Sequence, residues 1–176
     1  MRGKKWSAWL AVSAVVGGIV ALGAGSGDGE EDRALARTRR QIRMLDDIYK
    51  TAVVLITKHY VNDEDDLPAG TAAIVLFGEI KKKGWHEVKL LDAAGDPIDD
   101  ENTAQDGFEK AALEKMKAGS QWYEQQVTGE DGKRYLRVAT PIPVVLEKCT
   151  MCHENYKEAQ PGEAIGFLSY TVPMVE

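Results

Sequence analysis

Five consecutive residues near the C-terminus, Cys149-Thr150-Met151-Cys152-His153, have types and spacing that could do chemistry. They form the pattern C-x-x-C-H, which is typical of covalent haem attachment. Two thiols separated by two residues can form thioethers with the two vinyl groups of one haem, while the adjoining imidazole binds the iron. The sequence therefore predicts one haem c held by Cys149 and Cys152, with His153 as the proximal iron ligand.

These two cysteines, the only ones in the chain, allow three other interpretations. A thioredoxin-like pair normally opens a helix in a parallel βαβ unit, whereas this pair follows Pro141-Ile142-Pro143. Structural zinc needs about four ligands, and only His59 and His86 remain as further histidines. A disulfide closing so short a loop removes little entropy from the unfolded chain, so its stabilising effect is small.

The opposite axial position decides what the iron can do. His59 follows Leu55 by four residues and Ile56 by three, so we expect it to share the apolar face of a helix and point towards the core. His59 is therefore the candidate sixth ligand, whereas His86 is expected at the surface. The methionines that could instead supply sulfur are Met44, Met116, Met151 and Met174.

A porphyrin also needs apolar walls and partners for its propionates. Arg134, Arg137 and Lys148 are the expected propionate partners. The expected walls and edges, which ordinary core packing explains equally well, are Tyr60, Trp122, Tyr135, Leu136, Val138, Ile142, Val144, Val145, Ile165, Phe167 and Tyr170.

The N-terminal residues have the pattern of a targeting segment. Residues 1–5 are basic, and an uncharged apolar run of 20 residues follows from Trp6 to Gly25. This order is typical of a secretory signal peptide, and the length also suits a helix that spans a bilayer. Residues 1–26 are therefore predicted as a signal peptide or an N-terminal membrane anchor, and residues 27–32 as a polar linker. Either interpretation places the remainder in the periplasm or another extracytoplasmic space, free or anchored to the inner membrane.

Residues 33–176 are expected to form one domain. Hydrophobic spacing predicts helices over about residues 33–62, 69–83 and 106–117. Strands are expected at 86–91, 121–128, 134–140 and 164–172, with Gly129-Glu130-Asp131-Gly132 turning a hairpin. The predicted fold class is α+β, an antiparallel sheet flanked by helices.

Three segments around the cysteines carry a family resemblance: Arg137–Pro143, Cys149–His153 and Pro161–Gly166 with the closing strand. They resemble the exported c-type haem-binding domains with a PAS-like fold, a family formerly catalogued as a domain of unknown function. The resemblance covers residues 33–176. It implies a central antiparallel sheet with haem beside it, His153 as axial ligand, and a role in redox or small-molecule sensing through a partner protein. Some members use a cysteine as sixth ligand, and this chain has no spare one.

The net charge of the chain limits the classes of function that are expected. It is −6, and −9 without Arg2, Lys4 and Lys5, so the domain is not expected to bind the phosphates of a nucleic acid. The sequence favours a monohaem c-type cytochrome domain that transfers electrons, with a redox partner that is basic. A haem-based redox or gas sensor is the alternative. No acid–base constellation indicates an enzyme such as a peroxidase.

Overall fold

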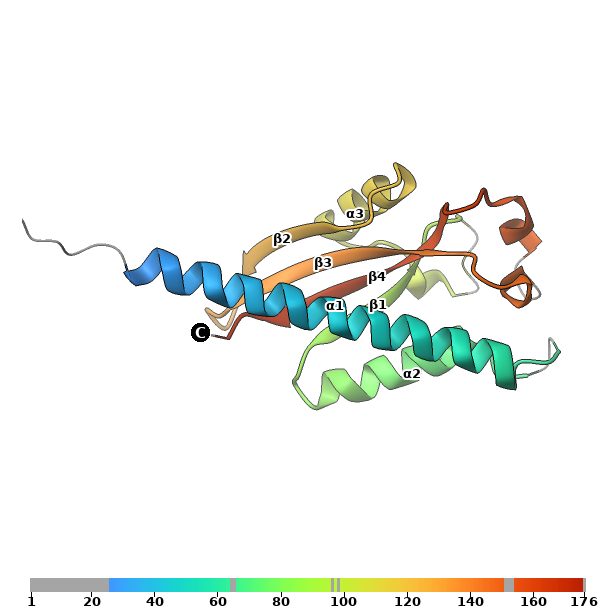
Figure 1. Ribbon diagram of the computed structural model, residues 1–176, viewed down its shortest axis with the longest axis horizontal. Helices are drawn as coiled ribbons and strands as arrows, with labels where there is room; N and C mark the ends of the chain where they lie inside the picture. The colour runs from blue at the N-terminus through green and yellow to red at the C-terminus, as the bar shows by residue number, and fades with distance from the viewer. Residues whose placement is uncertain (1–25, 64–65, 96, 98, 151–153, 176) are drawn as a thin grey trace, which may run out of the picture.

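The computed structural model describes residues 26–63, 66–95, 97, 99–150 and 154–175. Its elements confirm the α+β class, with one long N-terminal helix, two further helices and a four-stranded sheet (Figure 1). In chain order they are α1 (Ser26–Tyr60), α2 (Ala69–Lys82), β1 (Glu87–Asp92), the 3₁₀ turn η1 (Asp100–Asn102), α3 (Gly107–Lys117), β2 (Tyr123–Thr128), β3 (Arg134–Pro143), the 3₁₀ turns η2 (Glu147–Thr150) and η3 (Glu154–Glu158), and β4 (Ala164–Pro173).

All neighbouring strands in the sheet are antiparallel, in the order β1-β4-β3-β2. The predicted hairpin joins β2 to β3, where Thr128 pairs with Arg134 and Gly132 adopts a φ of 75° that suits glycine. The last strand, β4, lies between β1 and β3. Because helices cover both faces of the sheet, this inner strand is buried at eight of its ten residues.

Helix α1 begins earlier than the sequence pattern indicates. Residues 27–32, predicted as a linker, form its first turns. Glu30 and Glu31 suit this place because the helix dipole favours negative side chains near the N-terminus, and Glu31 also pairs with Arg134 of β3. The predicted signal peptide or anchor, residues 1–26, lies outside the described residues except for Ser26. Within the described part of the chain, no helix is both long and apolar enough to cross a membrane.

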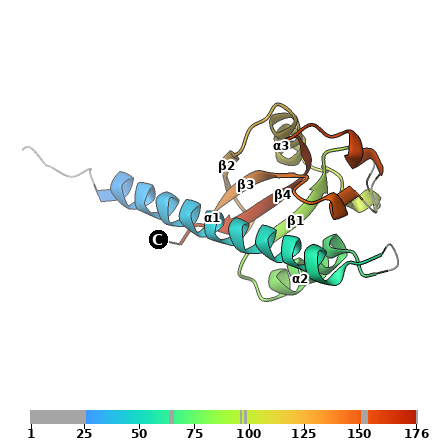
Figure 2. The ribbon, with the colours of Figure 1, turned by 45° about the vertical axis from the view of Figure 1, so that its right-hand side comes forward.

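Helices cover both faces of the sheet. α1 and α2 lie on one face and α3 on the other, and the N-terminal part of α1 extends past the end of the sheet (Figures 1 and 2). The start of α3 is well specified, because Asp106 accepts a hydrogen bond from the N–H of Glu109 while the Glu109 carboxylate accepts from the N–H of Asp106. Such a reciprocal cap satisfies N–H groups that otherwise have no partner in the helix.

The core has two parts, one on each face of the sheet. Successive residues of β4 alternate between them, so Leu168 and Tyr170 pack under α1 and α2 whereas Phe167 packs under α3. This alternation follows from the period of two in a strand. On the α1 side, Tyr49 packs edge-on against Phe77 of α2, with 5.1 Å between ring centroids.

A buried polar cluster fastens the middle of α1 to the sheet. One carboxylate oxygen of Asp46 accepts hydrogen bonds from the hydroxyls of Thr140 (2.5 Å) and Tyr170 (3.0 Å). The other accepts from the ammonium of Lys50 at 2.9 Å, and Lys50 also donates to Thr140 at 3.0 Å. Burial, together with the Asp46 carboxylate, raises the pKa of Tyr170 far above its usual range, so the phenol stays a hydrogen-bond donor.

Candidate functional site

The predicted attachment motif lies in the connection between β3 and β4, at one end of the sheet. Residues 144–163 leave the sheet after Pro143 and return at Ala164, and they contain η2 and η3 (Figure 1). Cys149 lies in η2, where its N–H donates to the carbonyl of Leu146 at 3.0 Å, and its thiol is free and half-buried. Met151, Cys152 and His153 lie outside the described residues, so the roles of Cys152 and His153 stay predictions.

A cavity of about 440 Å³ lies in this connection. Its lining comes from both sides of the motif, because η2 and the residues before it form one wall and η3 with the following residue forms another. The lining residues are Val144, Val145, Leu146, Glu147, Thr150, Tyr156, Lys157 and Ala159. The cavity is open to solvent, and its lining combines aliphatic and aromatic side chains with the polar Glu147, Thr150 and Lys157. Apolar side chains on both sides of the C-x-x-C-H residues in the sequence fit a covalently held haem.

Lys148, the residue before Cys149, ties η2 to the C-terminal end of α1. Its ammonium donates to the carbonyl oxygens of Val61 at 2.5 Å and Lys58 at 3.3 Å. A cation is favourable there, because the last carbonyls of a helix carry the negative end of its dipole. The sequence analysis expected Lys148 beside a propionate, whereas the structure uses it as a helix cap.

His59 belongs to the same helix end, in the last turn of α1. The structure thus brings the candidate sixth ligand and the attachment segment to one end of the molecule, although they are 90 residues apart. Its side chain is exposed, so the expectation that it points into the core is wrong. The buried face of α1 continues through Thr57, and a residue two positions further along a helix is rotated by about 200°.

His86 is placed far from the cavity. It precedes β1, whose first residue Glu87 pairs with Thr171, at the end of β4 away from the motif. The imidazole Nε2 lies 2.9 Å from the hydroxyl of Tyr49. The sequence analysis expected His86 at the surface, whereas its side chain is half-buried. Burial lowers the pKa of His86, so it stays neutral near pH 7.

The methionine candidates also lie elsewhere. Met116 is buried in the core under α3, Met174 is buried on the α1 side, and Met44 is exposed on α1. None of these three lines the cavity. Met151 lies outside the described residues.

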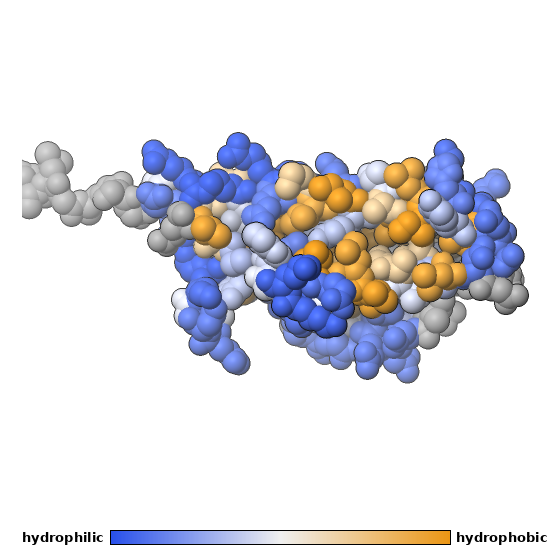
Figure 3. Space-filling view, turned by 90° about the horizontal axis from the view of Figure 1, so that it is seen from below, coloured by the Kyte–Doolittle hydropathy of each residue, from blue (hydrophilic) through white to orange (hydrophobic). Residues whose placement is uncertain are grey.

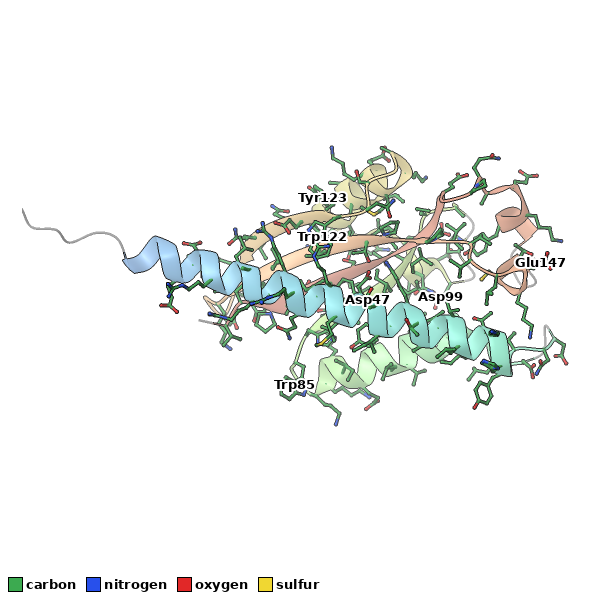
Figure 4. All side chains as sticks on the ribbon, viewed as in Figure 1. Asp47, Trp85, Asp99, Trp122, Tyr123 and Glu147 are labelled. Atoms are coloured by element: carbon green, nitrogen blue, oxygen red, sulfur yellow. The ribbon has the colours of Figure 1, made fainter. Side chains whose placement is uncertain are left out.

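Most of the predicted haem walls are ordinary core residues. Leu136, Val138 and Tyr170 pack under α1, and Phe167 packs under α3. Of the residues predicted as haem walls, Val144 and Val145 line the cavity. Trp122 donates a hydrogen bond to Glu124 and lies near the middle of α1, whereas Glu147 of the cavity wall lies at the far right of the same view (Figure 4).

The sequence analysis missed Tyr156 and Lys157 as cavity residues. Both follow the motif within four positions, and a one-turn spacing after His153 was the signal that could have found them. The cations that it chose instead are engaged elsewhere: Arg134 pairs with Glu31, and Arg137 pairs with Asp106 at 2.7 Å.

A second hollow, of about 190 Å³, lies between the start of α3 and the sheet. Its charges neutralise one another: the buried Glu109 accepts from Lys89 at 2.8 Å, and Arg137 binds Asp106 while its guanidinium lies over the ring of Phe108. Burial by itself raises the pKa of Asp106, but hydrogen bonds from the Glu109 N–H and Arg137 outweigh it and lower that pKa. These contacts anchor α3 to the sheet.

Comparison with known proteins gives two findings. A family model described as Tll0287-like matches residues 30–173. The fold is similar to the crystal structure of the cyanobacterial heme-protein Tll0287, with a TM-score of 0.58, 12% sequence identity, and coverage of 80% of this chain and 97% of that chain. At this identity the likeness concerns the fold. No curated protein matches the chain.

Proposed function

The chain belongs to the Tll0287-like family, and on this basis we propose that it binds one haem covalently through Cys149 and Cys152. His153 is the proximal iron ligand in this proposal. The C-x-x-C-H spacing supports the covalent attachment, and the solved relative is itself a heme-protein. The domain is then a monohaem c-type cytochrome domain that transfers electrons and catalyses no reaction of its own.

The observation that carries the proposal is the cavity of about 440 Å³ that brackets the motif. A bound haem supplies an iron centre that gains and loses one electron. The chain's own residues hold it: Cys149 and Cys152 attach it, while Val144, Val145 and Tyr156 offer it aliphatic and aromatic contact on one side. The polarity and solvent exposure of these surroundings tune the potential of the iron.

The surroundings support an exported electron carrier. Residues 1–26 direct the domain to the periplasm or another extracytoplasmic space, where c-type haem is attached, and anchor it to the inner membrane if they are retained. The acidic surface favours a basic redox partner, because opposite charges steer the encounter of two proteins. Nucleic acid is not a partner of such a surface.

A sensor is the second candidate function, and one contact favours it. Lys148 binds the end of α1 directly beside Cys149, and α1 then runs the full length of the domain towards residues 1–25. A change at the iron that moves η2 would reach this helix through the Lys148 cap. Such a domain would report redox state or a bound gas to a partner protein.

The attachment is tested by purification from a host that attaches c-type haem. We expect the wild-type protein to keep its pigment in acidified acetone, and a Cys149→Ser, Cys152→Ser double variant to release or lack it. Thr150→Ser, between the two cysteines, is the matched control and keeps the pigment. A colourless wild-type protein would refute the proposal.

The axial ligands are tested by spectroscopy of the ferric and ferrous protein with and without CO. His59→Gln is expected to change the spectrum if His59 is the sixth ligand, and His86→Gln serves as the histidine control that leaves it unchanged. A spectrum unaltered by His59→Gln removes His59 from the site. CO binding to the unmodified ferrous protein favours the sensor, and its absence favours the electron carrier.

A further inference from the structure

The solvent side of the α1–α2 layer is apolar, and no segment among the described residues covers it. On α1, Met44, Ile48 and Leu55 are 56%, 53% and 49% exposed, and on α2 Val75 is 63% exposed. Seen from below, apolar side chains gather on this side of the molecule with hydrophilic ones around them (Figure 3). Single exposed apolar residues are common, but a continuous group of this kind marks an interaction surface.

The apolar residues of α1 form one stripe that ends in cations. Met44, Ile48 and Leu55 are spaced by four and seven residues, so they lie on the same helix face. Exposed Arg40 precedes Met44 by four residues, and exposed Lys58 follows Leu55 by three. Long cationic side chains next to apolar surface can bury their stems there and extend their charged ends to polar groups.

Helix α2 adds Val75 to this surface. Exposed Lys82 follows Val75 by seven residues and lies on the same helix face, where it pairs with Glu79 at 2.7 Å, and Trp85 just beyond the helix is 67% exposed. Tryptophan and lysine are enriched where a protein meets the headgroup region of a bilayer, because each has an apolar body and a polar end. The exposed apolar surface thus has cations at its border.

The two helices of this layer are less acidic than the rest of the domain. Helices α1 and α2 together hold nine basic and seven acidic residues, a net of +2, and the loop between them adds four acidic residues, whereas residues 84–176 hold nine basic and 17 acidic ones, a net of −8. An anionic surface therefore favours the exposed cations of the two helices over the acidic opposite side, which orients the domain.

We propose that the exposed face of α1 and α2 docks on an anionic lipid surface, with its apolar stripes at the headgroup boundary and its lysines and arginines on the lipid phosphates. Position along the chain supports this occupant, because the apolar run Trp6–Gly25 ends at the start of α1. Amphipathic helices bind membranes in this way by combining buried apolar area with attraction to anionic lipids. The proposal does not depend on the bound haem.

The test compares lysine acetylation in the full chain reconstituted in two kinds of vesicle, phosphatidylcholine alone and an equal mixture with phosphatidylglycerol. Lys82 should react about fivefold more slowly in the anionic vesicles, the factor expected for one lysine held at an anionic surface. Lys110, exposed on α3 across the sheet, is the internal control and should react equally in both. High salt should abolish the difference.

A double variant, Ile48→Ser with Val75→Ser, adds a check on the apolar part. Both residues are exposed, so the variant should fold normally, and we expect it to lose most of the protection of Lys82 in anionic vesicles. Equal acetylation of Lys82 in both vesicles would overturn the proposal. Protection that is the same in both lipids and rises with protein concentration would also overturn it, because it would show that a second copy covers this face.

Discussion

Replacing Asp46 by alanine should weaken the contact between α1 and the sheet. The Asp46 carboxylate accepts hydrogen bonds from Thr140 and Tyr170 and an ion pair from Lys50. Thr140 keeps its contact with Lys50 in the variant, but the phenol of Tyr170 is fully buried and has no other hydrogen-bond partner among the described residues. Its pKa is too high for loss of the proton to relieve the unpaired donor.

The size of the effect follows from these contacts. Leaving a buried donor unpaired costs about 1–3 kcal/mol, and a hydrogen bond to a charged group contributes about 1.5–3 kcal/mol. Because Lys50 is partly exposed, its ion pair adds little. We therefore expect Asp46→Ala to lower the free energy of unfolding by about 3 kcal/mol. Tyr170→Phe should lower it by about 1 kcal/mol, because phenylalanine has no buried hydroxyl that needs a hydrogen-bond partner.

Urea unfolding of the purified protein, followed by far-ultraviolet circular dichroism, measures these values. The matched control is Asp47→Ala, because Asp47 is the next residue on α1 and is exposed (Figure 4). Its effect should stay within about 0.5 kcal/mol. The double variant Asp46→Ala, Tyr170→Phe should be less damaging than the sum of its parts. If Asp46→Ala and Asp47→Ala unfold at the same urea concentration, the reasoning is refuted.

Three further predictions concern other contacts. Burial lowers the pKa of His86, so as pH falls through the usual value of 6.5 this histidine takes up a proton in the unfolded chain before it does so in the folded one. Between pH 7 and 5 the free energy of unfolding of the wild type should therefore fall more than that of His86→Gln. Equal slopes of unfolding free energy against pH for the two proteins would contradict this. Lys148→Met removes the cap on α1 and should cost about 1 kcal/mol in urea unfolding, against no change for an exposed lysine such as Lys110→Met. Gly166→Ala would place a Cβ 2.9 Å from the carbonyl oxygen of Leu91, so its melting temperature should fall with a loss of about 2 kcal/mol; an unchanged melting temperature would show that the strands separate freely.

The possible partners of the domain fall on different sides of it. The acidic part, from Gly84 onwards, contains the candidate haem site and suits a basic redox protein. Helices α1 and α2 are less acidic and carry the exposed apolar residues. If both proposals hold, a lipid surface and a redox partner bind without competing for the same face.

Local patterns in the sequence determined much of the fold. The period of two in a strand puts neighbouring residues of β4, such as Phe167 and Leu168, on opposite faces of the sheet. The hairpin at residues 129–132 and the start of α3 at Asp106 also agree with the pattern, because turns and caps depend on neighbouring residues. The C-x-x-C-H motif is local in the same sense. The start of α1 was misjudged because glycines at its N-terminal end do not stop a helix whose next residues favour it.

Tertiary structure alone decided what surrounds the candidate site. Lys148 caps α1, and Arg134 and Arg137 bind carboxylates elsewhere, because of which distant segments meet. The direction of His59 was likewise undecided by spacing, because each residue turns a helix by about 100° and the face that a helix buries near its end depends on what packs there. Local features such as the C-x-x-C-H motif, turns and helix caps depend on neighbouring residues in the sequence, whereas the surroundings of a site depend on contacts between residues far apart in the chain.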